Sequence, residues 1–252
     1  MGRKTFQPEL KNLADGLAVR VVSIFKRFLT HLRPDTGGQV ITPDKQLHEW
    51  KRFQENHRDH APLSFAHDAV RVALVSTPQQ EQDAVALFHE LIGAKVLRGF
   101  RFFGTSQSDR YDSLFFMEYS GEDKILYDSK ANRLGVSRDY PLPYSTEPKV
   151  LEYKYSFESL VGDFEREEKF AKQIDLVVCW NVGTNYKSKY YLQSLLVGDE
   201  GSSRKIFGST HQAFATGQSV PDFEVVVLED VLNWLRDAAG EEARQKRMYR
   251  DP

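Results

Sequence analysis

Apolar residues at steps of three or four predict two helices near the N-terminus. The longer helix covers residues 9–33 and ends before a proline, which disfavours helical backbone in the residue that precedes it. Its apolar stripe comprises Leu10, Leu13, Leu17, Val21, Ile24, Phe28 and Leu32. A shorter helix is expected from about Pro43 to Glu55. Its apolar face comprises Leu47, Trp50 and Phe53. Residues 1–60 are therefore expected to form a helical N-terminal extension.

The pattern changes after residue 60, where short alternating stretches predict strands between helices. Ala69–Val75 alternates apolar and polar positions as a strand does. The helix that follows has Thr77 as its expected N-cap, Pro78 at its first position and Gly93 as its terminator. Its expected buried face comprises Ala84, Val85, Leu87, Phe88, Leu91 and Ile92.

Further elements complete an α/β pattern over residues 61–252, which we interpret as one domain. Strands are expected at 96–103, 114–119, 124–127 and 150–155, a helix at about 157–172 and a strand at 175–180. The tail predicts a hairpin of 190–197 with 205–208, a strand at 224–228 and a helix from Asp230. The core order is therefore helix, three strands, helix, strand, with a C-terminal strand and helix added.

Composition removes several classes of protein. The 252 residues carry 34 basic and 36 acidic side chains, a formal net charge of −2, so no global positive field attracts a polyanion and any nucleic-acid surface must be local. A single cysteine, Cys179, excludes an internal disulfide and is expected to be a buried packing thiol. No apolar run approaches the ~20 residues that span a bilayer. We therefore expect a cytoplasmic protein with no membrane partner.

A Glu-x-Lys pair on a predicted strand is the first candidate for chemistry. The tripeptide occurs six times, but five copies lie in predicted helices or turns or beside a proline. Only Glu152 and Lys154 lie in a strand, where alternation directs both side chains to one face of the sheet. Burying both charges is costly unless they pair or serve a site. The alternative is a partly exposed cross-strand salt bridge.

Other acidic residues precede this pair on suitable elements. Asp112 stands at the start of the apolar stretch LFFMEY, where the preceding strand of a hairpin can bring a carboxylate to Glu152. On the helix that ends at Gly93, Glu81 lies in the first turn and Glu90 near the end. Asp109 and Asp128 remain alternatives to Asp112, although Asp128 lies in a predicted turn.

The order of a helix Glu, a strand Asp and a Glu-x-Lys strand, followed by a helix and a strand, resembles the PD-(D/E)XK nuclease superfamily with its restriction-endonuclease-like fold. The resemblance covers roughly residues 76–181. It implies that Asp112 and Glu152, with the carbonyl of Tyr153, bind Mg²⁺ or Mn²⁺. It also implies that Lys154 positions or helps to deprotonate the attacking water, and that a helix Glu holds a metal-bound water or a second ion.

Within this superfamily the stretch resembles archaeal Holliday-junction resolvases, whose helix Glu precedes the terminating Gly by about three turns. That spacing favours Glu81 over Glu90. Two departures from the usual pattern are visible. No proline precedes Asp112, and 40 residues separate Asp112 from Glu152, so additional structure must be inserted between their strands.

A local basic and aromatic stretch is the candidate nucleic-acid surface. Lys187 and Lys189 alternate with tyrosines after the 175–180 strand, a composition that can grip a backbone and stack bases. The tyrosines are Tyr186, Tyr190 and Tyr191. Arg98 and Arg101 are expected to add phosphate contacts. The alternative is a lysine-rich sheet edge that resists aggregation.

A looser likeness joins LRPDTGG, EYKYS, DLVVCWN and GSTHQAF to the nuclease-like C-terminal part of bacterial proteins that carry a gyrase/Hsp90-type ATPase domain, a group associated with defence and DNA handling. It implies an ATPase domain or subunit as a partner. The leading hypothesis is a metal-dependent DNA endonuclease. The alternatives are an inactive nuclease-like module that binds DNA or a partner and dimerises through residues 9–33, and an unrelated α/β interaction domain.

Overall fold

The computed structural model describes residues 43–58, 60–63, 71–106, 109–120 and 125–249. The chain divides into two compact units, residues 1–59 and 60–252. In the first unit, helix α2 spans Pro43–Arg58, which confirms the second expected helix and extends it beyond Glu55. The apolar residues Leu47, Trp50 and Phe53 are exposed. The helix expected at 9–33, and the dimer contact hypothesised for it, lie outside the described residues.

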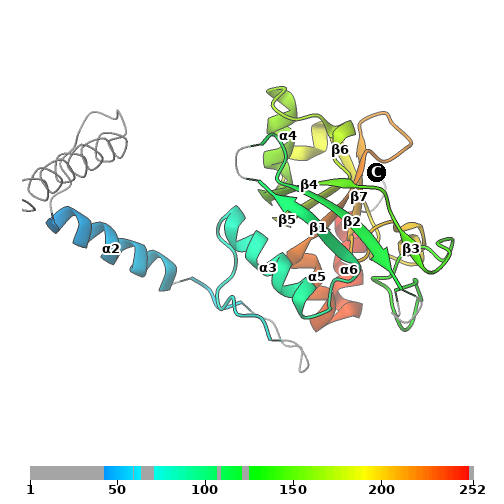
Figure 1. Ribbon diagram of the computed structural model, residues 1–252, viewed down its shortest axis with the longest axis horizontal. Coiled ribbons are helices and arrows are strands. Elements are labelled where there is room, and N and C mark those ends of the chain that lie inside the picture. The colour runs from blue at the N-terminus through cyan, green and yellow to red at the C-terminus, as the bar shows by residue number, and fades with distance from the viewer. Residues whose placement is uncertain (1–42, 59, 64–70, 107–108, 121–124, 250–252) are drawn as a thin grey trace, which may run out of the picture. The chain divides into compact units, whose positions relative to one another are not determined.

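The second unit is built on a mixed β-sheet (Figure 1). Along the sheet the strand order is β1-β2-β4-β5-β8-β7-β6, and the short β3 pairs with β2. Strands β4, β5 and β8 run parallel to one another, whereas the pairs β1–β2, β2–β4, β6–β7 and β7–β8 are antiparallel. The strands are β1 (Phe100–Thr105), β2 (Ser113–Tyr119), β3 (Tyr144–Ser145), β4 (Lys149–Ser156), β5 (Leu176–Asn181), β6 (Tyr190–Ser194), β7 (His211–Ala215) and β8 (Phe223–Val227).

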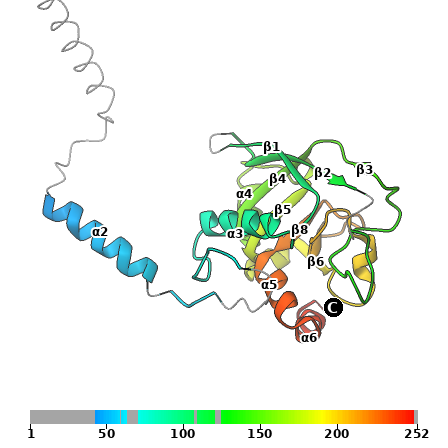
Figure 2. The same cartoon turned by 60° about the horizontal axis from the view of Figure 1, so that its bottom comes forward.

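Helices cover both faces of this sheet and create two apolar cores (Figure 2). Helices α3 (Glu81–Gly93) and α5 (Leu228–Arg236) contribute to one core, and α4 (Phe157–Glu165) contributes to the other. Helix α6 (Ala238–Met248) packs against α5. Three short 3-10 helices also occur, η1 (Ala171–Gln173), η2 (Asn185–Ser188) and η3 (Glu200–Ser203). None of the described helices has the length and apolar character needed to cross a bilayer.

Strand β4 divides its side chains between the two faces. Leu151 and Tyr153 join the core beneath α3, so the alternate residues Glu152 and Lys154 face the side covered by α4. The neighbouring strand β5 alternates in the same way, and Cys179 is buried in the α4 core as expected. The sheet therefore places two charged residues of a central strand under a helix layer.

The structure corrects several expected elements in the first half of this unit. Residues 71–75 form no strand, and the rest of the stretch expected at 69–75 lies outside the described residues. Helix α3 begins at Glu81 with Gln80 as its N-cap, so Thr77 does not cap it. The first strand of the sheet begins at Phe100 rather than at residue 96. Of the expected strand at 124–127, only an isolated bridge at Leu126 is found in the described part.

In the second half of this unit, strand pairing and the ends of helices differ from the expected ones. Strand β6 pairs with β7 rather than with residues 205–208, which form turns. Helix α4 ends at Glu165, earlier than the expected residue 172, and the chain then passes through the short η1. The C-terminal helix begins at Leu228 and is followed by α6, which the sequence pattern did not separate from it. These errors concern pairings and element ends.

Candidate active site

Glu152 and Lys154 form an ion pair in the middle of β4. The Glu152 side chain is completely buried, and Lys154 is 15% exposed. The Lys154 Nζ lies 3.0 Å from the Glu152 Oε1. A carboxylate without solvent on a central strand is costly to ionise unless specific partners balance its charge. The expected alternative of a partly exposed salt bridge therefore does not fit the burial of Glu152.

Asp112 lies beside this pair, at the entrance to β2. Strand β2 runs antiparallel to β4 with Ser113 opposite Leu151, so the residue before Ser113 falls next to Glu152. The Asp112 Oδ2 accepts a hydrogen bond of 2.7 Å from the backbone N–H of Tyr153. That bond fixes one carboxylate oxygen of Asp112 to the strand that carries Glu152 and Lys154. The hairpin delivers Asp112 as the sequence predicted.

The first turn of α3 brings Glu81 to the same place. The Glu81 Oε2 lies 3.7 Å from the Lys154 Nζ. Glu90, at the other end of the helix, accepts hydrogen bonds from the backbone N–H groups of Ala73 and Leu74, so its carboxylate is used to hold that segment. Of the two candidate helix carboxylates, Glu81 is the one within ion-pair distance of Lys154.

Of the two alternatives to Asp112, Asp109 is exposed and its backbone N–H donates to the Ser106 hydroxyl, and Asp128 lies in a turn. Its carboxylate accepts hydrogen bonds from the backbone N–H groups of Lys130 and Ala131 and pairs with Arg138. These bonds keep the pKa of Asp128 below its usual value. The structure therefore uses Asp128 to close a turn, as its sequence context predicted.

Two further charged residues at the site were not expected. Asp163 on α4 is buried, lies 3.2 Å from the Lys154 Nζ and also pairs with Arg166. Lys169, in the segment after α4, is 14% exposed and donates to the Glu152 Oε1. Asp163 falls three residues after the buried Leu160, so an acidic residue on the inner helix face was a visible signal. Lys169 carries no such local signal, because the fold of an irregular segment decides where its amine lies.

At Glu152, Glu81 and Lys154, burial and the nearby opposite charges act on the pKa in opposite directions. Burial raises the pKa of Glu152 above its usual value, although Lys169 and Lys154 oppose the shift and Asp112 adds to it. Burial likewise raises the pKa of Glu81. For Lys154, burial acts to lower the pKa but the carboxylates around it prevail, so its pKa is raised. Lys154 is therefore a permanent cation at neutral pH.

One oxygen of Glu152 lacks any partner. Both ammonium groups are within ion-pair distance of Oε1, while Oε2 is buried and accepts no hydrogen bond from any residue that the structure describes. A buried carboxylate oxygen without a donor is a rare feature that calls for an explanation. Within the described residues, no three Asp, Glu, His or Cys side chains are arranged as a set of metal ligands. The Glu152 Oε2 is thus available as an acceptor, while Lys154 and Lys169 both pair with Oε1.

An open cleft of about 620 Å³ runs beside these residues. It is lined by Glu81, Gln82, Val85, His89, Thr105, Ser106, Asp112 and Tyr153. Farther along α3 from Glu81, the Tyr153 hydroxyl lies 3.0 Å from the His89 Nε2. Burial lowers the pKa of His89 and thus favours its neutral form. A substrate in this cleft would meet carboxylates at one end and a neutral polar pair at the other.

The expected nucleic-acid surface is only partly available. Tyr186 is buried with its ring 5.5 Å from that of Phe157, so the prediction that it stacks on bases is wrong. Lys187 is exposed and lines a groove of about 700 Å³ with Tyr191. Lys189 lies 3.6 Å from Glu165. Both lysines lie beside β6, an outer strand of the sheet, which also suits the alternative of a protected edge.

The two arginines near β1 have structural contacts. The Arg98 Nε donates to the backbone carbonyl of Lys95, and its guanidinium lies 5.6 Å from the centroid of the Phe207 ring. Arg101 pairs with Glu118 at 3.1 Å, and both side chains are exposed. Exposed pairs of this kind contribute little to stability and break readily. Arg101 can therefore exchange Glu118 for a phosphate at small cost.

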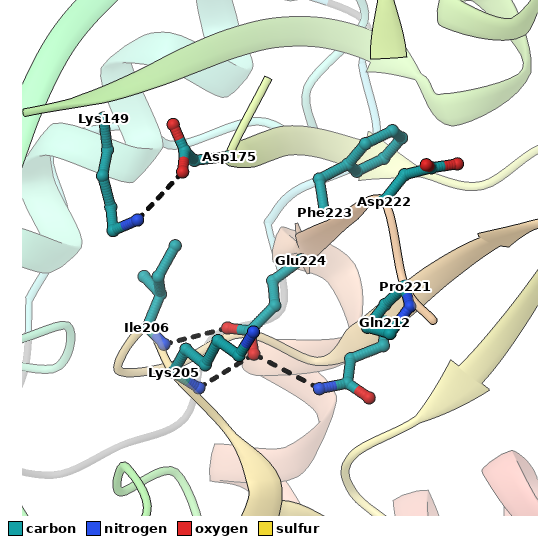
Figure 3. A pocket seen from close by; sticks show the side chains of 9 residues that line it. All are labelled: Lys149, Asp175, Lys205, Ile206, Gln212, Pro221, Asp222, Phe223 and Glu224. Atoms are coloured by element: carbon teal, nitrogen blue, oxygen red, sulfur yellow. Dashed lines mark hydrogen bonds and ion pairs between the residues drawn. The ribbon is translucent and has the colours of Figure 1, made fainter. Parts of the chain in front are cut away.

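A smaller pocket, of about 100 Å³, lies at the N-terminal end of the parallel strands (Figure 3). Lys149 at the start of β4 pairs with Asp175 at 2.9 Å, and Glu224 of β8 receives hydrogen bonds from Lys205, Ile206 and Gln212. The carboxylates of Asp175 and Glu224 at this pocket are thus engaged with neighbouring residues. We interpret it as a structural joint between the strands and the loop before β7.

Comparisons of the chain with protein-family models, with curated proteins and with solved structures found no match. The geometry of the site is therefore the basis for any functional assignment.

Proposed function

We propose that this protein is a metal-dependent nuclease that hydrolyses phosphodiester bonds of DNA on a restriction-endonuclease-like core. The observation that carries the proposal is the buried carboxylate of Glu152, with one oxygen unpartnered, beside Lys154, Asp112 and Glu81. These four residues come from α3, the entrance of β2 and the middle of β4. These segments are distant in sequence, and they bring three carboxylates and one amine close together, as a catalytic site requires.

The chain order supports the same proposal. Leaving the short β3 aside, the elements follow one another as α3, β1, β2, β4, α4 and β5. This order agrees with the helix, three strands, helix and strand expected from the sequence. The long gap between Asp112 and Glu152 contains β3 and the loops on either side of it, so the insertion leaves the register of β2 with β4 intact.

The donor chemistry fits a hard divalent cation. Carboxylate oxygens are the ligands that Mg²⁺ and Mn²⁺ take in proteins, and the free oxygen of Glu152 is an available one. Asp112 and Glu152 would hold the ion, and Glu81 would reach it directly or through water. When bound, Mg²⁺ supplies a counter-charge for the phosphate and lowers the pKa of a coordinated water.

The residues of the chain perform the remaining work. Lys154 remains protonated, so we assign it as a donor to a phosphate oxygen and a stabiliser of the negative charge that grows during the reaction. This replaces the expectation that Lys154 helps to deprotonate the water. Glu152, Asp163 and Glu81 hold its ammonium from three directions, which fixes the amine in place. Orientation of this kind lowers the barrier before any bond changes.

Cleavage of supercoiled plasmid DNA with Mg²⁺ or Mn²⁺ tests the proposal. We expect wild-type protein to nick and linearise the plasmid, and Asp112→Asn and Lys154→Met to reduce the rate by about 10³-fold. Lys172→Met, on an exposed residue of η1, is the control and is expected to cleave normally, whereas Asp109→Asn tests the remaining alternative to Asp112. Equal cleavage by Asp112→Asn and the wild type would contradict the assignment.

The alternative is a nuclease-like module that binds DNA or a partner without cutting. Two observations favour it. Two ammonium groups already pair with Glu152, and the described residues contain no group of three side chains arranged to hold a metal ion. Retained DNA binding with no cleavage in either metal would establish this alternative. An ATPase partner, a cytoplasmic location and a role in bacterial defence or DNA processing belong to the proposal and rest on the sequence alone.

A further inference from the structure

Lys169 is the residue of the site whose role is least explained. It lies between α4 and η1, and its amine reaches Glu152 from outside the strand. In the described part of the chain Glu152 is the only carboxylate within ion-pair distance of it. The Lys169 Nζ also lies over the Tyr111 ring, 6.0 Å from its centroid. One ion pair and one ring contact therefore account for the position of this cation.

Lys154 provides the contrast on the same oxygen. Three carboxylates surround its amine, so displacement of one leaves two others in place. Lys169 loses its whole ion pair when it leaves Glu152. Of the two cations on Oε1, Lys169 is thus the easier one to displace.

A divalent cation cannot bind Glu152 without meeting these charges. A divalent cation and an ammonium group a few ångströms apart repel each other, and the repulsion is stronger where water is excluded. Moving Lys169 away removes one of the two ammonium groups that oppose the ion. The displaced amine needs another anion, and a phosphate group of the proposed DNA substrate is such an anion.

We propose that the Lys169–Glu152 ion pair closes the metal site in the free protein, and that Lys169 exchanges Glu152 for a phosphate oxygen when DNA binds. This inference rests on the proposed function and adds a regulation of the same site. Its consequence is coupling: DNA raises the affinity for the divalent cation, and the cation raises the affinity for DNA by the same factor. The protein would thereby hold its metal only where its substrate is present.

The first test measures Mn²⁺ binding without DNA, by the electron paramagnetic resonance signal of the free ion. We expect Lys169→Met to bind Mn²⁺ at least about tenfold more tightly than the wild type, because the competing charge is gone. Lys169→Arg keeps the charge and is expected to bind weakly, as the wild type does. Lys172→Met, which changes an exposed lysine on η1, is the control for loss of one positive charge nearby.

The second test measures the coupling itself. A fluorescein-labelled duplex is titrated with protein with and without Ca²⁺, and a denaturing gel verifies that the duplex stays intact. We expect Ca²⁺ to tighten binding by the wild type about fivefold or more, and to tighten binding by Lys169→Met less than twofold. Thermal denaturation verifies folding, and Lys169→Gln replaces Lys169→Met should the latter not fold.

The outcomes separate this inference from the proposed function. Suppose Lys169→Met binds Mn²⁺ no more tightly than the wild type, while Glu152→Gln weakens binding; then the ion-pair exchange is wrong and the metal site stands. Tighter binding by Lys169→Arg would also overturn the inference, since charge would not be the cause. Absence of Mn²⁺ binding in the wild type and in all variants, with or without DNA, would overturn both.

Discussion

Glu152 and Glu224 are two buried carboxylates on parallel strands separated only by β5, and their surroundings differ in kind. Both oxygens of Glu224 accept hydrogen bonds: Lys205 and Ile206 donate backbone N–H groups at 2.8 and 2.9 Å, and Ser209 donates its hydroxyl at 2.6 Å. Figure 3 shows the backbone donors converging on the carboxylate. Glu152 has two lysine ammonium groups on one oxygen, and no described residue donates to the other.

The difference indicates what each carboxylate is for. Backbone donors are fixed by the chain path, so Glu224 is bound in one arrangement and holds the loop before β7 against β8. Arg204 completes that joint, fully buried with its guanidinium directed at the carbonyls of Leu195, Arg133 and Gly135. Lysine amines on flexible stems can be exchanged for other cations. Glu152 is thus a buried carboxylate that can still accept another cation, whereas both oxygens of Glu224 are used to hold the fold together.

Glu152→Gln, which keeps the shape of the side chain and removes its charge, tests whether Glu152 serves cleavage rather than folding. We expect cleavage to fall by about 10³-fold or more because the ligand charge is lost. The free energy of unfolding should fall less than in Glu224→Gln, because removal of a costly buried charge offsets the loss of the carboxylate partner of Lys154 and Lys169. Plasmid cleavage and urea denaturation measure the two effects. Loss of stability with retained cleavage would reverse the roles assigned here.

The same substitution at Glu224 should give the opposite result. Glu224→Gln turns one acceptor into an amide donor that faces donors, and we expect the free energy of unfolding to fall by about 2–3 kcal/mol. Cleavage per folded molecule should be unchanged at a temperature where the variant remains folded. Urea denaturation followed by circular dichroism measures the loss. A neutral effect on stability would show that the joint does not depend on this charge.

The pH dependence of the free energy of unfolding tests the charge state of Glu152. Because burial raises the pKa of Glu152 above its usual value of 4.5, the folded protein binds this proton more tightly than the unfolded chain does. Its contribution to stability is therefore fully present below the unfolded pKa and is lost as the pH rises through the folded pKa. We expect the stability of the wild type relative to Glu152→Gln to decrease from pH 4 to pH 7, measured by urea denaturation.

Cleavage should follow the reverse trend over the same range, since protonated Glu152 is a poor cation ligand. A rate that rises with pH while the relative stability falls would support one carboxyl group as the origin of both. A relative stability that increases between pH 4 and pH 7 would contradict the direction of the pKa shift.

The smallest effect is expected at the surface lysines. Lys187→Ala should weaken DNA binding by less than about threefold and reduce the salt slope by about one phosphate contact. Tyr186→Phe keeps the buried ring and should not change DNA affinity at all. Anisotropy titrations at several salt concentrations measure both. A tenfold loss in Tyr186→Phe would mean that the tyrosine contacts DNA after all.

Much of this arrangement could be predicted from short-range pattern. Alternation on β4 put Glu152 and Lys154 on one face, and the apolar stretch after Asp112 placed that residue at a strand entrance. Both rest on the period of a strand, which is local. The start of α3 was wrong because Thr77 and Pro78 have the chemistry of a helix start, whereas Gln80 is the N-cap without a side-chain bond.

The parts that failed depend on distant segments. The partner of β6 is β7 rather than residues 205–208, because Glu224 and Arg204 hold that loop in turns through bonds that no local pattern shows. Lys169 reaches Glu152 because α4 ends at Glu165 and the chain turns back. Tyr186 looked exposed in sequence, yet the short η2 directs it onto Phe157.

A crystal structure of the protein with Mn²⁺ and a short duplex, collected at the manganese absorption edge, would test whether Asp112 and Glu152 hold a divalent cation. We expect an anomalous peak in contact with Glu152 and Asp112, with the Lys169 amine turned away from Glu152. A peak elsewhere, or DNA bound with no peak and Lys169 still on Glu152, would contradict it.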